Sequence, residues 1–204
     1  AYMENTKKLT ATVIALEEPD TLRDRLGCAE WASTESIKIM RSIGTKDIAL
    51  LSGLAHNSLK CIDLQDAIIS NLPEGAFEGC EELESIILPQ CTTLPKNIFK
   101  GCKSLTNVEL QSPLTTIEPF AFSDCTALEQ INLPQNISLI GEKAFYNCTK
   151  LALIESKAPY PPICHESSFE NISASCQFVI PANHLNDYCA VEYWKKHNPT
   201  EAQQ

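Results

Sequence analysis

The amino-acid sequence predicts an α/β solenoid, in which short parallel strands and one-turn helices or loops coil into a right-handed superhelix. One phrase recurs every 22 or 23 residues, in copies at 72–88, 94–110, 117–133 and 140–156. Each copy carries a phenylalanine and, three places later, a cysteine; the pairs are Phe77/Cys80, Phe99/Cys102, Phe122/Cys125 and Phe145/Cys148. Such a period is typical of solenoids, because each unit buries its apolar side only by stacking on the next.

Each unit contains one short strand, written L-x-x-I-x-L. In the first copy Leu83, Ile86 and Leu88 are expected to point inward, and Pro89 ends the strand because proline cannot donate to a ladder. The segment between strands is too short for a long helix and is expected to drive its phenylalanine into the core. We therefore predict a stacked column of phenyl rings beside a column of thiols.

The ten cysteines do not show the spacing of a zinc site or of a CxxC pair. Neighbouring rungs lie about 5 Å apart, which does not exclude a disulfide by distance. Equivalent side chains point the same way, however, so the four repeat cysteines are expected to form a reduced ladder that packs as small hydrophobes. The other six could include one bridge that the sequence does not pair; they are Cys28, Cys61, Cys91, Cys164, Cys176 and Cys189.

The organisation predicted from these patterns has three parts. Residues 1–56 form an α+β N-terminal cap, 57–160 the repeats, and 161–204 a degenerate last repeat with a strand–helix C-terminal cap. Caps are required because terminal rungs expose core.

Both caps contain recognisable element patterns. The N-terminal cap is expected to contain strands within 7–16 and 35–44, a short helix within 19–27 capped by Asp20 or Thr21 and stopped by Gly27, and a second helix beginning at Asp47. The C-terminal cap is expected to contain a last strand at 176–181 and one helix through 182–197, in which Leu185, Tyr188 and Cys189 lie at helical spacing and Trp194 follows as a plug.

Composition limits the possible partners. The formal net charge is −10, whereas nucleic acids and anionic membranes require a basic footprint. No apolar run approaches the length that spans a bilayer. The chain opens without a signal-peptide pattern, which indicates either a cytosolic protein or a form from which the leader is absent.

The segments GCEELESIILP and IGEKAFYNCTKL resemble the BspA-like leucine-rich repeats, and FVIPANHLNDYCAVEYWKKH is similar to the closing segment of that family. Gly141 occupies a place where the family carries glycine, and Pro73, Pro95 and Glu118 replace it in the other copies. The resemblance implies a secreted or cell-surface protein of a host-associated anaerobic bacterium. Some members of the family are adhesins that bind host matrix proteins or other microbes. It supplies no catalytic, cofactor-binding or metal-binding residue.

The candidate binding site is the solvent-facing side of the repeat strands, because solenoids usually bind partners on extended strand surfaces. The residues are Asp63, Ser85, Ile87, Asn107, Glu109, Gln130, Asn132, Leu153 and Glu155, with Cys61 at the same face. This surface is polar, mildly acidic and nearly free of aromatics, which disfavours a sugar platform. Solvated strand residues without any ligand are an equally simple interpretation.

Other motifs have simpler explanations. Cys164-His165-Glu166 lacks the base and orienting group of a nucleophilic site or the spacing of a metal site. The aromatics Tyr188, Tyr193 and Trp194 are expected to cover the last rung rather than to form a binding patch. The tripeptides at Asn136, Asn147 and Asn171 match glycosylation acceptors by chance.

The sequence thus favours a non-enzymatic protein that binds another protein or mediates adhesion. A structural spacer or assembly module is the alternative, and an enzyme is a remote one. No cofactor is expected. The ligand, the anchor and the oligomeric state are not determined by the sequence.

Overall fold

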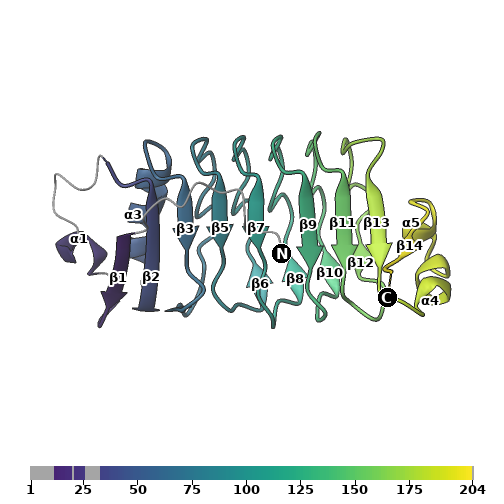
Figure 1. Ribbon diagram of the computed structural model, residues 1–204, viewed down its shortest axis with the longest axis horizontal. Coiled ribbons are helices and arrows are strands. Elements are labelled where there is room, and N and C mark those ends of the chain that lie inside the picture. The colour runs from purple at the N-terminus through teal and green to yellow at the C-terminus, as the bar shows by residue number, and fades with distance from the viewer. Residues whose placement is uncertain (1–11, 20, 26–32, 204) are drawn as a thin grey trace.

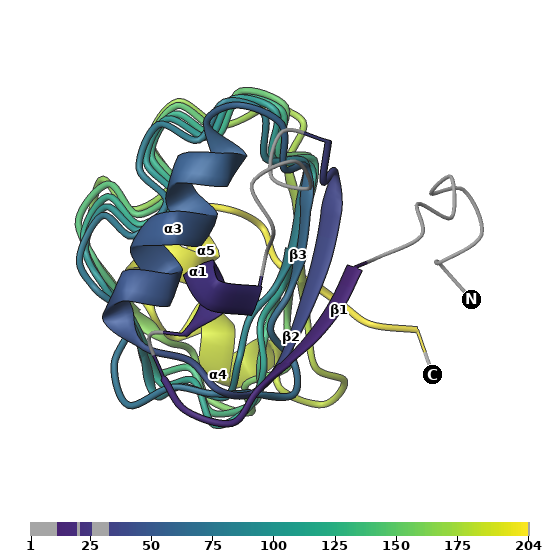
Figure 2. The same cartoon turned by 90° about the vertical axis from the view of Figure 1, so that its left-hand side faces the viewer.

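The computed structural model describes residues 12–19, 21–25 and 33–203 of the chain, and it shows the expected solenoid of short parallel strands. The strands lie side by side along the long axis (Figure 1). Seen along that axis, the rungs follow one another with nearly the same outline, and helix α3 covers one end (Figure 2). One sheet contains β1 (Thr12–Leu16), β2 (Ser36–Ser42), β3 (Cys61–Asp63), β5 (Ser85–Ile87) and β7 (Asn107–Glu109).

A second sheet continues the same row of strands. It contains β9 (Gln130–Leu133), β11 (Leu153–Ser156), β13 (Gln177–Ile180) and β14 (Thr200–Glu201), all parallel. The apolar pattern explains the pairing, because Leu83, Ile86 and Leu88 are buried as predicted, and the alternating residues remain solvent-facing. Register aligns like with like: Ile86 pairs with Val108, and Ile131 pairs with Ile154.

Each rung also contributes a second, two-residue strand that the sequence pattern did not reveal. These strands are β6 (Thr93–Leu94), β8 (Thr116–Ile117), β10 (Leu139–Ile140) and β12 (Ile163–Cys164), and they form a sheet of their own, while β4 (Ala67–Ile68) pairs with β2.

The phenylalanine segments between the strands are hydrogen-bonded turns. Each turn needs a residue with positive φ just before the cysteine position: Gly79, Gly101, Asp124, Asn147 and Asn171, with φ from 59° to 76°. Glycine, asparagine and aspartate are the residues that tolerate this conformation best.

The predicted columns of rings and thiols are both present in the core. Five phenyl rings stack in sequence, from Phe77 through Phe99, Phe122 and Phe145 to Phe169, with centroids 5.1–5.8 Å apart. The thiols are free, which confirms the reduced ladder. Three of the four repeat thiols donate to the carbonyl oxygen of the phenylalanine one rung before: Cys102 to Phe77 at 3.0 Å, Cys125 to Phe99 at 3.1 Å, and Cys148 to Phe122 at 3.1 Å.

The N-terminal cap joins α1 (Leu22–Arg25) to α3 (Thr45–Ala55). The prediction that the second helix begins at Asp47 was wrong by two residues, because Asp47 lies in the first turn. Its buried carboxylate accepts the backbone N–H of Gly44 at 3.0 Å and that of Leu22 at 2.8 Å, which ties the two helices together. The predicted stop and one predicted cap, Gly27 and Asp20, lie outside the described residues.

The C-terminal cap differs from the prediction in two respects. Two short helices, α4 (Leu185–Cys189) and α5 (Glu192–Lys195), replace the expected single helix, and β14 follows the strand expected to be last. Leu185 is 39% exposed. In one continuous helix, Tyr188 and Trp194 would lie about 120° apart around the axis. The break at Val191, which is extended, lets both rings pack together, 5.0 Å apart, over the last rung.

Trp194 is the predicted plug. Its side chain is fully buried, and its Nε1–H donates to the carbonyl oxygen of Pro162 at 2.8 Å. None of the helices in the described part of the chain is both long and apolar enough to traverse a bilayer.

Candidate functional site

The parallel register collects the predicted site residues on one surface, which we call the strand face: the solvent-facing side of β3, β5, β7, β9, β11 and β13. One row follows the first residue of each strand: Cys61, Ser85, Asn107, Gln130, Leu153 and Gln177. A second row lies two residues further along: Asp63, Ile87, Glu109, Asn132, Glu155 and Val179. Adjacent members within a paired sheet lie roughly 5 Å apart. All nine predicted residues are therefore presented together, half-buried or exposed.

Charges are compensated at the N-terminal end of the strand face. The Lys38 ammonium contacts the carboxylates of Asp63 at 3.0 Å and Asp66 at 2.7 Å, and these hydrogen bonds raise the pKa of Lys38. Lys60 lies 3.6 Å from Glu84. Asp63 is thus an ion-pair partner within the protein rather than a free charge.

Toward the C-terminal end the face is acidic and uncompensated. Glu109 and Glu155 lie on β7 and β11, and Glu129 directly precedes β9. Among the residues that the structure describes, none of the three carboxylates has a basic group within ion-pair distance. The carboxylates of the face are thus ion-paired near its N-terminal end and without ion-pair partners, among the described residues, toward its C-terminal end.

The strand face also contains a break, which we call the seam, between β7 and β9. Elsewhere a carbonyl before one strand accepts two N–H groups of the next rung: Glu84 accepts from Thr106 and Asn107, and Glu129 from Ala152 and Leu153. Within the described residues, no ladder joins β7 to β9, and the carbonyl of Thr106 receives no such bonds.

The seam is also open at its lower end, which lies at the C-terminal ends of β7 and β9. Leu88 N–H donates to the carbonyl of Glu109, but Leu110 N–H has no corresponding bond to β9 in the described part of the chain. A groove of about 260 Å³ lies there, lined by Leu110, Ser112, Asn132, Pro134, Gln135 and Lys157. The thiol ladder and the second-strand sheet remain continuous behind it. Only the strand face is interrupted at this rung, among the residues described.

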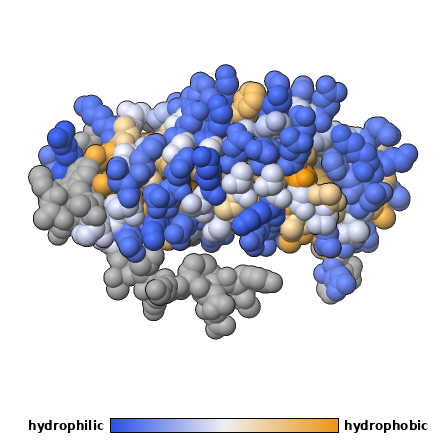
Figure 3. Space-filling model, turned by 90° about the horizontal axis from the view of Figure 1, so that it is seen from above, coloured by the Kyte–Doolittle hydropathy of each residue, from blue (hydrophilic) through white to orange (hydrophobic). Residues whose placement is uncertain are grey.

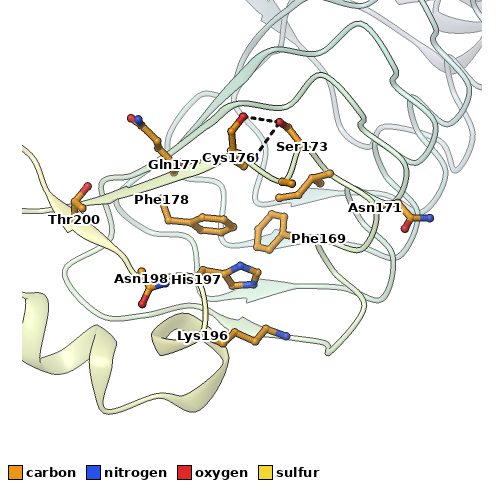
Figure 4. Close-up of a pocket in the computed structure, with 13 residues that line it drawn as sticks. Phe169, Asn171, Ser173, Cys176, Gln177, Phe178, Lys196, His197, Asn198 and Thr200 are labelled. Atoms are coloured by element: carbon orange, nitrogen blue, oxygen red, sulfur yellow. Dashed lines mark hydrogen bonds between the residues drawn. The ribbon is translucent and has the colours of Figure 1, made fainter.

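A hollow of about 630 Å³ lies against the C-terminal cap (Figure 4). Figure 4 shows Phe169, Phe178 and His197 gathered at its centre, with Lys196 and Thr200 further out. Both phenyl rings are 5% exposed or less, so they offer little apolar surface to a ligand.

The titratable groups of this hollow are poorly suited to catalysis. His197 stacks on Phe178 with centroids 4.3 Å apart, and burial lowers its pKa to about 4. Its Nε2 is buried without a hydrogen-bond partner. Burial raises the pKa of Cys176 to about 11, so the histidine is neutral and the thiol protonated near pH 7. The hollow therefore contains no activated nucleophile.

A cysteine–histidine contact that the sequence did not suggest joins the first repeat to α3. Cys80 Sγ lies 3.4 Å from His56 Nδ1, but the same Nδ1 lies 2.8 Å from the carbonyl oxygen of Ser52. A nitrogen that donates to a carbonyl cannot also accept the thiol proton. Burial also raises the pKa of Cys80 to about 11, and the side chain is inaccessible. The pair closes the end of the thiol ladder. The residues are 24 positions apart, with no motif that links them.

The remaining motifs lie apart from one another. Burial raises the pKa of Cys164 to about 12, and His165 Nδ1 lies 2.8 Å from Ser167 Oγ. No group of metal-ligating side chains occurs among the described residues. Asn147 Nδ2 donates to Asp124 Oδ1 at 2.8 Å.

The surface seen from above is predominantly hydrophilic, with apolar residues in small clusters (Figure 3).

Comparison with known sequences gives one family. The model described as "BspA type Leucine rich repeat region (6 copies)" matches residues 33–94 and 52–174. Curated proteins include no sequence that matches this chain.

Several solved structures are similar. A leucine-rich repeat protein from Bacteroides ovatus is 22% identical with a TM-score of 0.56, over 93% of this chain and 41% of that one. The Treponema pallidum leucine-rich repeat protein is 24% identical with a TM-score of 0.49, over 59% and 57%. A leucine-rich cell-surface protein from Faecalibacterium prausnitzii is 27% identical with a TM-score of 0.46, over 77% and 42%. The matches span from about two fifths to under three fifths of the lengths of those proteins.

Proposed function

Because this chain belongs to the BspA-type leucine-rich repeat family, we propose that it is a non-enzymatic scaffold that binds another protein through its strand face. Repeat scaffolds of this kind present extended surfaces without a dedicated cavity. The observation that carries the proposal is the register of β3 to β7 and of β9 to β13, which arranges outward side chains, most of them polar, into two rows on each side of the seam. The hollow at the C-terminal cap contains no activated nucleophile among the residues that line it, so no reaction is assigned to it.

The place of action follows from the family resemblance. Relatives are typically exported, and we propose that this protein works at the cell surface or outside the cell, in adhesion to a host matrix protein or to another surface protein. Adhesive partners are large and their surfaces varied, which suits a long face better than a pocket. Interfaces of this type commonly bury about 800 Å² on each partner.

The experiment is a binding panel of purified extracellular matrix and cell-surface proteins, measured by biolayer interferometry. The test variant carries Glu109→Lys and Glu155→Lys on the strand face. The control carries Glu142→Lys and Glu170→Lys, which change net charge equally at exposed positions in the turns between strands. Asp63 is left unchanged because its ion pair with Lys38 contributes to the fold.

The proposal expects at least one partner whose binding the strand-face variant abolishes and the control retains. Equal loss in both variants would place binding outside the strand face. A panel without any partner would instead support a structural spacer.

A further inference from the structure

The seam combines two features that coincide nowhere else on the described strand face. The first is a set of backbone groups without strand partners: the carbonyls of Thr106 and Asn132 and the N–H groups of Leu110 and Gln130. At every other junction between described neighbours in this row of strands, a ladder occupies the equivalent groups. The open groups face a surface, where water or a partner can satisfy them.

The second feature is charge. Glu109 borders the seam on β7, Glu129 precedes β9, and Glu155 lies one strand further. Lys157, which lines the groove at the lower end, is the single basic residue of this part of the face among those described. The N-terminal acids differ, because Lys38 and Lys60 already contact them. Free negative charge is therefore concentrated around the seam.

We propose that the seam is the docking site for a basic segment of the partner protein, with arginine side chains entering from the strand face. This inference rests on the proposed function and names the chemistry of the partner. Arginine presents up to five donors in a planar fork and is the residue best suited to carboxylates and carbonyls together. Glu109 and Glu129 supply the carboxylates. Thr106, the residue before β7, supplies a free backbone carbonyl, whereas the equivalent carbonyls of Glu84 and Glu129 accept N–H groups of the next rung.

Charge complementarity selects this occupant over others. An acidic segment would meet three like charges, and nucleic acid would meet the same repulsion. An apolar helix would leave both the carboxylates and the open backbone groups unpaired, which costs free energy. A basic segment satisfies the carboxylates, and the opposite charges also accelerate its approach.

The test measures the affinity of the full chain for a fluorescein-labelled peptide by fluorescence anisotropy at physiological salt. The peptide is about twelve residues long and alternates arginine with serine. A glutamate–serine peptide of equal length is the charge control. The seam variant is Glu109→Gln with Glu129→Gln, and the matched variant is Glu142→Gln with Glu170→Gln, which removes the same net charge far from the strand face.

We expect the seam variant to bind the arginine peptide about tenfold more weakly, and the matched variant to change by less than about twofold, since losing a charge-assisted hydrogen bond costs about one decade of affinity or more. Amide shifts in NMR spectra of the labelled protein should concentrate at Leu110, Glu129 and Gln130. Thermal unfolding of both variants should match that of the parent, because all four side chains are solvent-accessible.

Equal weakening in the two variants, or shifts centred away from the seam, would overturn the inference. One result would contradict the inference but leave the proposed function standing. In that result, the variant with Glu109→Lys and Glu155→Lys loses binding of a partner protein, whereas the variant with Glu109→Gln and Glu129→Gln changes the affinity for the same partner by less than about twofold. In that result the strand face binds, and the seam does not direct it.

Discussion

The column of phenyl rings gives the sharpest stability prediction. Phe122 is fully buried between Phe99 at 5.3 Å and Phe145 at 5.1 Å, whereas Phe77 is equally buried but, among the described rings, stacks on Phe99 alone, at 5.8 Å. Truncating a core phenylalanine to alanine costs about 3–5 kcal/mol through lost transfer free energy and the cavity left behind. Each aromatic pair contributes about 0.5–1.5 kcal/mol beyond its buried area.

We therefore expect Phe122→Ala to lower the free energy of unfolding by about 4–5 kcal/mol and Phe77→Ala by about 3–4 kcal/mol. The difference corresponds to one ring–ring contact. Urea unfolding followed by circular dichroism measures both values, and a similar slope with urea would show that the two variants expose comparable surface on unfolding. Since proteins are typically stable by about 5–15 kcal/mol, either loss is large enough to measure.

A double-mutant cycle isolates the stacking energy. Phe99→Leu and Phe122→Leu, singly and together, should show a coupling of about 0.5–1.5 kcal/mol. A coupling near zero, or a Phe77→Ala cost equal to that of Phe122→Ala, would refute ring stacking as a source of stability and leave burial alone.

Other predictions concern the thiols, the C-terminal histidine and the N-terminal cap. Cys125→Ser should cost about 1 kcal/mol less than Cys125→Ala, because a hydroxyl can still donate to the carbonyl of Phe99; equal costs in urea unfolding would show that the sulfur–oxygen contact contributes nothing. Native Cys125 should resist alkylation until the protein unfolds, because burial raises its pKa well above the usual thiol value; mass spectrometry that detects modification of the folded form would contradict this. Burial lowers the pKa of His197 to about 4, so the unfolded chain binds more protons between the two pKa values and stability falls as pH drops from about 6.5 toward 4. The contribution is about 1–3 kcal/mol, and thermal unfolding across this range should show a shallower pH dependence in His197→Phe than in the parent. Asp47→Ala should cost about 2–4 kcal/mol, because it leaves the N–H groups of Gly44 and Leu22 without their carboxylate; a loss below about 0.5 kcal/mol would show that this tie between α1 and α3 is dispensable.

Much of the fold was predictable because a stack of rungs imposes the same environment on equivalent positions. Phe99 and Phe122 recur at one place for that reason, and their stacking at 5.3 Å follows from the period alone. The inward strand residues, the free thiols and the plug at Trp194 follow from the same logic. The strand-face residues were predictable as a surface, because alternation identifies which side chains face solvent. That they bind a partner stays a prediction.

The boundaries that were missed depend on contacts between distant segments. The start of α3 was misplaced because Asp47 caps its own helix while it holds Leu22, which is 25 residues away. The C-terminal helix breaks so that Tyr188 and Trp194 can both cover the last rung. In both cases the local sequence pattern predicted one helix boundary, and contacts with distant residues stabilise a different one.

A strict repeat carries its own architecture, since buried rings and thiols at a fixed spacing can be satisfied only by neighbours of the same kind. The repeat pattern therefore defined the solenoid and its reduced interior, and the composition defined its acidic character. The tertiary structure decided where that acidity is free and where the strands separate. Lys38 forms ion pairs with Asp63 and Asp66, while β7 and β9 meet without a ladder beside Glu109. These features arise from distances between rungs, and a linear pattern of residues does not record such distances.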